Sequence, residues 1–419
     1  MKSLATGIVC LLALWTVGAP AQQSASIRAF TGARVIDGSD RPPIDNATIV
    51  VRDGRIVSVG PAARATVPAG AERVALAGKT VIPGLINAHG HVGNTVGLEQ
   101  GKYSAENVQK DLRTYAAYGI TTVFSLGDDQ AAGFAARDSQ KTPALDRARL
   151  YVAGPVLAPK TVDEARKLVD EDAAMKVDIV KIRVDDNLGT TAKMAPEIYR
   201  AVIDQAHKKG LRVAVHLFYL DDAKSVLDAG ADFIAHSVRD VPVDDAFAAM
   251  MKRRDVCYCP TLMREVSTFV YESTPAWFSD PLFLKHADAK SLETLKQPAR
   301  QEQMRTSKSA QRYKAGLEVA NKNLKKLSDA GVKIALGTDG NTPWAPHVEM
   351  ADMVAAGMTP SQVIVAATKN GAEFLRMTAT GTIVNGAIAD FLILDANPID
   401  DITNTRKISA VYLAGQKVR

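Results

Sequence analysis

The chain has 419 residues, of which 23% are charged and 47% hydrophobic, and its formal net charge is +5 at pH 7. Such a composition is that of an ordinary globular protein and excludes a disordered chain. The mild positive charge, without a long run of Lys and Arg, argues against nucleic acid as a partner.

Residues 1–21 have the pattern of a secretory signal peptide. Lys2 precedes the apolar stretch 4–17, and Ala19-Pro20-Ala21 supplies the small residues of a cleavage site. The stretch is too short to span a bilayer and no second one follows, so we expect no membrane association. We therefore expect a periplasmic or secreted protein that is cleaved after Ala21.

Two cysteines, Cys257 and Cys259, follow the expected signal peptide. Two residues apart, they are badly placed to bridge to each other, and we interpret them as buried thiols within a strand. The protein is then expected to fold on its hydrophobic core, without disulfides.

Both ends of the mature chain show short alternating runs and tight turns. Asp53-Gly54 separates two such runs, and Asn385-Gly386 and Ala414-Gly415 mark turns near the other end. Neither end alone has enough strands to bury a core. We therefore predict that residues 22–81 and 380–419 pair into one small β-sandwich domain.

The middle of the chain, residues 82–379, alternates apolar runs with charged helical stretches. Glycines at the ends of the helical stretches precede several of the runs, as is typical of a helix C-terminus. We predict a (β/α)8 barrel of the α/β class; an open doubly wound sheet is the alternative, but no Gly-rich phosphate loop follows an early strand. The eight candidate strands are 81–88, 120–126, 149–155, 178–184, 211–218, 232–238, 255–262 and 332–338.

One connection is much longer than the others. Residues 263–330 form an insertion after the seventh candidate strand, with a long polar helical stretch. An insertion at the carboxyl end of a barrel strand lies over the catalytic face, where it can act as a lid or wall. It is equally able to be an oligomer contact, so a homo-oligomer stays an open alternative.

Polar residues gather at the carboxyl ends of the candidate strands. A lone histidine there is often a satisfied core residue, and an aspartate can simply cap a turn. A lysine inside a buried strand is costlier, and its neutral amine can react with CO₂ to give a carbamate. In a barrel all these strand ends meet at one face, which predicts a cluster of His89, His91, Lys181, His216, His236 and Asp339.

Three motifs extend this pattern to a known family. PGLINAHGH at the first strand, GTDG after the eighth, and ADFLILDANP with LAGQKV near the C-terminus resemble those of the amidohydrolase superfamily of metal-dependent hydrolases. Lys181 makes the chain similar to the imidazolonepropionase-related branch, which contains Xaa-Pro dipeptidases, aryl carboxypeptidases and mycotoxin amidases.

The resemblance implies a centre with two divalent metal ions, with zinc as the expected ion. His89, His91 and Asp339 would hold one ion and His216 and His236 the other, with N6-carboxylated Lys181 bridging them. A hydroxide shared by the ions would attack the scissile carbonyl, and Asp339 would act as the catalytic proton carrier.

The substrate implied is a small molecule with an amide bond, such as an Xaa-Pro dipeptide or an N-acyl amino acid. A cyclic amide, lactone, carbamate or phosphotriester is the alternative for the same centre, and a non-catalytic binding protein on a degenerate barrel is the alternative of another class. Candidate substrate contacts are Tyr219, Arg183 and His347. The loop after the third strand, AGPVLAPKTVDEAR, lacks the Gly-Gly-His segment typical of dipeptidase-like relatives.

Overall fold

The structure is a computed structural model that describes residues 27–142 and 144–419. The predicted signal peptide, residues 1–21, lies outside the described residues. Within them, no helix combines the length and the apolar character needed to cross a bilayer.

Strands from both ends of the chain form one eight-stranded sheet with the order β16-β15-β14-β5-β1-β2-β3, and β4 pairs with β1. The link between the two ends is the antiparallel pairing of β5 with β14. A β-sandwich needs two sheets packed face to face, whereas these strands are hydrogen-bonded into one continuous sheet. The predicted β-sandwich therefore stays a prediction. The strands are β1 (Ile27–Val35), β2 (Ile44–Arg52), β3 (Arg55–Pro61), β4 (Glu72–Ala75), β5 (Thr80–Pro83), β14 (Phe391–Leu394), β15 (Ile408–Leu413) and β16 (Gln416–Lys417).

The turns predicted in this sheet are confirmed at two hairpins. Asp53 and Gly54, with φ of 50° and 78°, join β2 to β3, and Ala414 and Gly415, with φ of 45° and 72°, join β15 to β16. Positive φ at both positions is what a two-residue hairpin turn requires. Phe30 packs edge-on against Phe391, with ring centroids 5.0 Å apart, and fills the core of the sheet.

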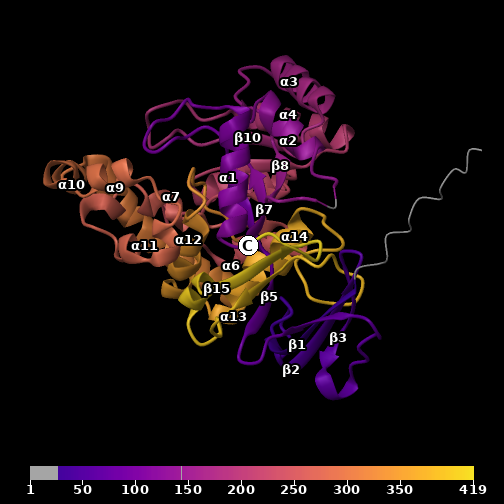
Figure 1. Ribbon diagram of the computed structural model, residues 1–419. Helices are drawn as coiled ribbons and strands as arrows, with labels where there is room; N and C mark the ends of the chain where they lie inside the picture. Colours follow the sequence, from indigo (N-terminus) through magenta and orange to yellow (C-terminus); the bar gives the residue numbers. More distant parts are fainter. Residues whose placement is uncertain (1–26, 143) are drawn as a thin grey trace, which may run out of the picture.

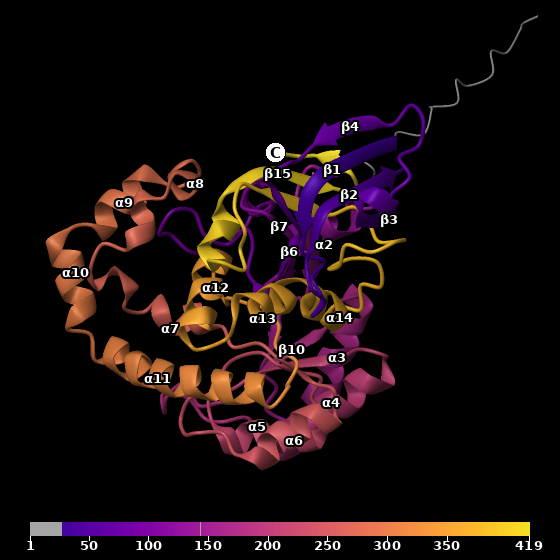
Figure 2. The same ribbon diagram turned by 90° about the horizontal axis from the view of Figure 1, so that it is seen from below.

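The middle of the chain is an α/β unit of parallel strands. One sheet has the order β6-β7-β8 and the other the order β13-β12-β11-β10-β9. Helices α3 to α6 lie side by side along the outside of these strands (Figure 2). The strands are β6 (Leu85–Gly90), β7 (Ile120–Ser125), β8 (Arg149–Val152), β9 (Val156–Leu157), β10 (Val180–Arg183), β11 (Val213–His216), β12 (Phe233–Ile234) and β13 (Cys257–Tyr258).

Each of the connecting helices follows one of these strands. They are α1 (Ala105–Ala117), α2 (Ala131–Asp138), α3 (Val162–Met175), α4 (Pro196–Lys208), α5 (Leu220–Ala229) and α6 (Asp245–Arg253). After the last strand position come α12 (Ala345–Ala355), α13 (Pro360–Val365), the π-helical turn Ala366–Asn370 and α14 (Gly371–Phe374). Outside the insertion, the 3-10 segments of the described residues are Ala62–Arg64 and Ile402–Arg406.

The sequence predicted a closed cylinder of eight strands. Among the described residues, the parallel strands instead form two separate hydrogen-bonded sheets. Gly154, with φ of 70°, and Pro155, which lacks an N–H, interrupt the third candidate run, so that β8 pairs with β7 while β9 pairs with β10. The eighth run, 332–338, forms no regular strand of its own. It is joined to β13 by an isolated parallel bridge from Ile334 to Tyr258, and to β6 by the hydrogen bond from the N–H of Ala88 to the carbonyl of Leu336 at 2.8 Å. The first run, 81–88, also divides, since β5 joins the terminal sheet.

The predicted insertion forms an arm of helices. The helices α9, α10 and α11 extend to the side of the molecule away from β1–β3 (Figure 1). The arm returns to the body where Tyr118 donates a hydrogen bond to the carbonyl of Phe283 at 3.2 Å. Its elements are α7 (Leu262–Val266), the 3-10 turns Val270–Glu272 and Ala276–Ser279, α8 (Pro281–Leu284), α9 (Ala289–Leu295), α10 (Pro298–Arg305) and α11 (Lys308–Asp329).

A carboxyl group in α3 predicts a specific pH dependence of stability. Asp172 is fully buried, and neither carboxyl oxygen has a hydrogen-bond partner among the described residues, so burial raises its pKa to about 7. The folded protein then keeps a proton that the unfolded chain releases as pH rises from about 4 to 7, and stability falls over that window. In Asp172→Asn this fall should shrink, leaving the variant about 2–4 kcal/mol more stable relative to wild type at pH 8 than at pH 4.

Denaturant unfolding at several pH values between 4 and 8 measures this difference. Asp170→Asn is the matched control, because Asp170 lies on the same helix but is exposed and paired with Lys209. Identical pH profiles for wild type and Asp172→Asn would show that the Asp172 pKa is unshifted.

Candidate metal centre

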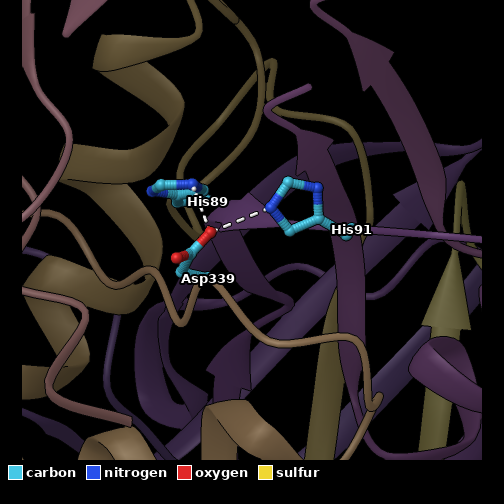
Figure 3. A group of neighbouring side chains, drawn as sticks. All are labelled: His89, His91 and Asp339. Carbon is cyan, nitrogen blue, oxygen red and sulfur yellow. Dashed lines mark hydrogen bonds and ion pairs between the residues drawn. The ribbon is translucent and has the colours of Figure 1, made fainter. Parts of the chain in front are cut away.

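Three predicted ligands converge at the ends of β6 and of the segment 332–338. The Nε2 atoms of His89 and His91 lie 3.0 and 2.9 Å from the same oxygen, Oδ1 of Asp339 (Figure 3). One ligand atom from each of the three residues falls within 4.8 Å of the others. The sequence predicted this group from the two-residue spacing of the histidines and from the Asp after an apolar run.

Backbone contacts fix which ring nitrogen faces the cluster. Nδ1 of His89 lies 2.9 Å from the carbonyl oxygen of Ala235, and Nδ1 of His91 lies 3.2 Å from that of Gly127. A carbonyl can only accept, so both Nδ1 atoms carry the proton, and in the neutral ring Nε2 presents a lone pair. This is the second contact that orients metal-binding histidines in proteins.

The three ligand atoms therefore suit a cation. Two Nε2 lone pairs and a carboxylate oxygen, three acceptors, face one another at short distance, and a shared cation satisfies all three. Burial lowers the pKa of His89 to about 4, which keeps that ring neutral. Burial acts against protonation of His91 as well. The hydrogen bond to Asp339 and the negative charge of that carboxylate together outweigh burial and raise the pKa of His91, so a proton is the alternative positive charge at this point.

His236 adds a fourth nitrogen to the cluster. Its ring lies 4.8 Å from that of His89, centroid to centroid, and its Nε2 is 3.9 Å from Oδ2 of Asp339. Nε2 is buried and has no hydrogen-bond partner among the described residues. A buried nitrogen without a partner is costly in the protein alone, and a ligand at the cluster would relieve that cost.

Lys181 lies in the same group, on β10. Its Nζ is 3.5 Å from Nε2 of His89, and its side chain is buried. Burial lowers the pKa of the amine to about 8. About one tenth of the amine is then uncharged at pH 7, and the uncharged amine is the form that reacts with CO₂.

The ring of His216 packs against the ring of His236, but its Nε2 contacts other residues. Its centroid lies 4.0 Å from that of His236, but its Nε2 lies 3.0 Å from Oδ2 of Asp185 and 3.2 Å from Nη2 of Arg183. The candidate substrate contact Arg183 is thus a neighbour of His216. Tyr219 is three residues further on, and its hydroxyl donates to Asp186 at 2.9 Å.

His347, the third candidate substrate contact, is not brought to the cluster. It lies on α12 with Nε2 2.9 Å from the carbonyl of Tyr118 and Nδ1 3.4 Å from Oγ1 of Thr405. Its ring packs against Trp344 at 5.0 Å, and it is buried. The prediction was wrong because both nitrogens are engaged between α12 and the 3-10 segment Ile402–Arg406, which makes His347 a core histidine.

Sequence reasoning missed the polar residues at the start of α7, because Thr261 was assigned to the seventh candidate strand and Arg264 to the insertion. Oγ1 of Thr261 lies 2.7 Å from Nδ1 of His236, and Nε of Arg264 lies 3.3 Å from Oδ2 of Asp339. The buried carboxylate of Glu349 accepts the first two N–H groups of α7, from Leu262 and Met263, at 2.9 and 2.7 Å. The only available signal was the polar pair Arg264-Glu265 just after an apolar run.

Close packing holds the cluster from behind. A Cβ at Gly337 would lie 2.3 Å from Sγ of Cys259 and 2.7 Å from Cβ of His89, so only glycine lets this segment approach β6. Cys257 and Cys259 are buried free thiols, as predicted, but only Cys257 lies within a strand, and Cys259 follows the end of β13.

Thr261 offers a test of how His236 is oriented. It is a β-branched residue with φ of 48° and ψ of 48°, a strained conformation of the kind that functional sites retain. In Thr261→Val the contact to Nδ1 is lost, so we expect affinity for divalent metal to fall about 10- to 100-fold.

Competition with a chelating dye measures that affinity. Thr405→Val is the matched control, since Thr405 is an equally buried threonine that contacts His347 instead. Equal metal affinity in wild type and Thr261→Val would contradict the role of Thr261 in orienting His236 for metal binding.

Comparison with known proteins places this chain in a family. A family model described as "Amidohydrolase family" matches residues 80–418. Imidazolonepropionase from Streptomyces avermitilis is 26% identical over 405 residues, covering 90% of this chain and 88% of that protein. Imidazolonepropionase from Deinococcus radiodurans is 23% identical and covers 90% and 92%.

Solved structures agree. A protein assigned as a prolidase from Bifidobacterium longum has a TM-score of 0.75 at 26% identity, with 94% of each chain covered. A Xaa-Pro dipeptidase with methionine in its active site has a TM-score of 0.76 at 22% identity, covering 94% of this chain and 99% of that one. The chain belongs to the amidohydrolase family and is a hydrolase of carbon–nitrogen bonds.

Proposed function

We propose that the protein is a binuclear metal-dependent amidohydrolase that cleaves the amide bond of a dipeptide, such as Xaa-Pro, or of an N-acyl amino acid. The observation that carries the proposal is the convergence of acceptors on one point, together with the unpartnered Nε2 of His236 beside it. His89, His91 and Asp339 would hold one divalent ion and His216 and His236 the other, with zinc as the expected ion. Lys181, carboxylated on Nζ, would bridge them.

Bound divalent ions of this kind lower the pKa of water and polarise a carbonyl oxygen. The chain's own residues supply the rest. Asp339 is an acceptor within the cluster and is 19% exposed, so its Oδ2 is suited to take a proton and return it to the leaving amine. Arg183 and Tyr219 are the proposed substrate contacts near His216.

The fold supports the same proposal. We propose that the parallel strands form a (β/α)8 barrel whose ladder is interrupted at Gly154-Pro155, with residues 22–81 and 380–419 as a composite domain. Such a barrel gathers strand ends at one face, which is where its chemistry lies. We propose export to the periplasm or outside the cell on the basis of residues 1–21.

A second candidate is hydrolysis of a cyclic amide by the same centre. It is favoured by the relatives named imidazolonepropionase, since an imidazolone is a cyclic amide. A relative named enamidase, from Eubacterium barkeri, is 30% identical but matches only 44% of this chain. Open-chain cleavage remains our first choice because the neighbouring prolidase from Bifidobacterium longum matches 94% of the chain.

Purified protein assayed on N-acyl amino acids, Xaa-Pro dipeptides, cyclic amides, lactones and phosphotriesters tests the proposal. We expect hydrolysis of the open-chain amides, its loss after removal of metal by a chelator and its return on adding zinc. Inactivity on every amide would contradict the proposal, and activity confined to cyclic amides would favour the second candidate.

Lys181→Ala should lower kcat about 10³-fold or more, since the loss of a bridging ligand removes several kcal/mol of transition-state stabilisation. Lys209→Ala is the matched control, because Lys209 is an exposed lysine paired with Asp170 at 2.9 Å. Full activity of Lys181→Ala would exclude the bridging role.

A further inference from the structure

Arg264 is a charged side chain at the centre to which the roles above give no task. Its Nε lies 3.3 Å from Oδ2 of Asp339, and its Nη1 donates to Oε1 of Glu265 at 2.7 Å. The side chain of Arg264 is 17% exposed, close to the 18% of His91 and 19% of Asp339, whereas that of Glu265 is 1% exposed. Arg264 therefore shares the accessible part of the site with His91 and Asp339.

The position of the guanidinium is fixed from two sides. Glu349 holds the start of α7 by accepting the N–H groups of Leu262 and Met263. From the insertion, the ring of Tyr313 on α11 lies under the guanidinium, with Cζ 5.3 Å from the ring centroid. A guanidinium that is already oriented loses little entropy when it binds a planar anion.

The charges around Arg264 do not balance without Asp339. Oε1 of Glu265 is shared, since it also lies 2.9 Å from Nε of Arg239. Arg239 is buried, and its Nη1 donates only to the carbonyls of Leu217 and Ser237, which are neutral. Two guanidinium charges thus face one Glu265 carboxylate, and Asp339 supplies the second negative charge.

Binding of a metal ion by Asp339 changes the balance of charge around Arg264. In the proposed centre the charge of Asp339 is shared with a cation, so Arg264 is left with an excess of positive charge at the accessible surface. A mostly buried charge of that kind is stabilised by an anion brought by the substrate.

The position of Arg264 indicates whether that anion lies on the leaving-amine side or on the acyl side of the substrate. Asp339 is the proposed proton carrier to the leaving amine, and Arg264 lies beside its Oδ2. A carboxylate on the carbon next to the leaving nitrogen therefore falls nearer to Arg264 than one on the acyl side. Arg183, the other candidate for a carboxylate, lies at His216 instead.

We propose that Arg264 binds the free carboxylate of the leaving amino acid, and that the substrates are amides of α-amino acids with an unblocked carboxyl group. This rests on the proposed function, whose dipeptide and N-acyl amino acid substrates carry this carboxylate, and it assigns the residue that recognises it. Arg264 is then a residue that determines specificity, and its effect belongs mainly to KM.

The test compares each N-acyl amino acid with its own carboxamide, which keeps the scissile bond and removes the charge. Wild-type metal-loaded enzyme should prefer the acid about 10- to 100-fold in kcat/KM. In Arg264→Met that preference should disappear, mainly through a higher KM for the acid. An effect of the variant through Asp339 acts on the acid and the carboxamide alike, so it cancels in their ratio of kcat/KM. Arg264→Lys should restore part of the preference, because a lysine keeps the charge without the planar fork.

Arg254→Met is the matched control, because Arg254 is exposed and donates to the backbone carbonyl of Asp228. Metal content and thermal unfolding should be the same in all variants, so that a loss of ions or of fold is recognised. An unchanged acid preference in Arg264→Met, or no preference in wild type, would overturn the proposal while leaving amide hydrolysis intact.

Calorimetry supplies a second measurement that needs no turnover. A dipeptide analogue with a phosphonamidate in place of the scissile amide should bind wild type about 10- to 100-fold more tightly than its C-terminal carboxamide. This difference should be absent in Arg264→Met. If wild type hydrolyses no amide, the proposed function fails, and equal binding of the two analogues would then separately overturn the role of Arg264.

Discussion

The structure depends on a small electrostatic conflict among three acceptors. The carbonyls of Ala235 and Gly127 hold the Nδ1 protons of His89 and His91, so that both Nε2 lone pairs face Oδ1 of Asp339. Acceptors in contact repel one another unless a positive charge lies among them. A divalent ion is the charge that nitrogen and carboxylate ligands in this arrangement are suited to bind.

The surrounding fold keeps that conflict in place. The missing side chain of Gly337 lets the segment after α11 approach β6 closely enough for Asp339 to reach the histidines. The strained Thr261 turns the chain at the start of α7 and orients His236. These contacts come from backbone and buried groups, which move little. Rigid surrounding residues are what a site needs to impose ligand geometry.

Much of the site followed from sequence because strand periodicity is a strong local signal. Alternation places His89 and His91 on one side of a strand, and the parallel arrangement brings Lys181, His236 and Asp339 towards them. The same reasoning failed for His347, since a helix after a strand carries no mark of which residues face the site. It also missed Arg264, because residues just after a strand cannot be separated from the insertion by composition.

The fold was predictable in class but not in detail. The glycines and apolar runs indicated alternating helices and parallel strands, which is what the α/β unit contains. The interruption at Gly154-Pro155 and the weak eighth segment depend on backbone pairing that an apolar pattern does not encode. The direct pairing of β5 with β14 shows how the two ends of the chain come together, which the sequence indicated only through the need to bury a core.

Anomalous diffraction from crystals of the zinc-loaded protein tests the central claim most directly. We expect one zinc peak between His89, His91 and Asp339, a second beside His216 and His236, and density for a carbamate on Nζ of Lys181. Absence of zinc from the first position, with Asp339 still bound to a protonated His91 and to Arg264, would contradict the claim that the three acceptors form a metal site.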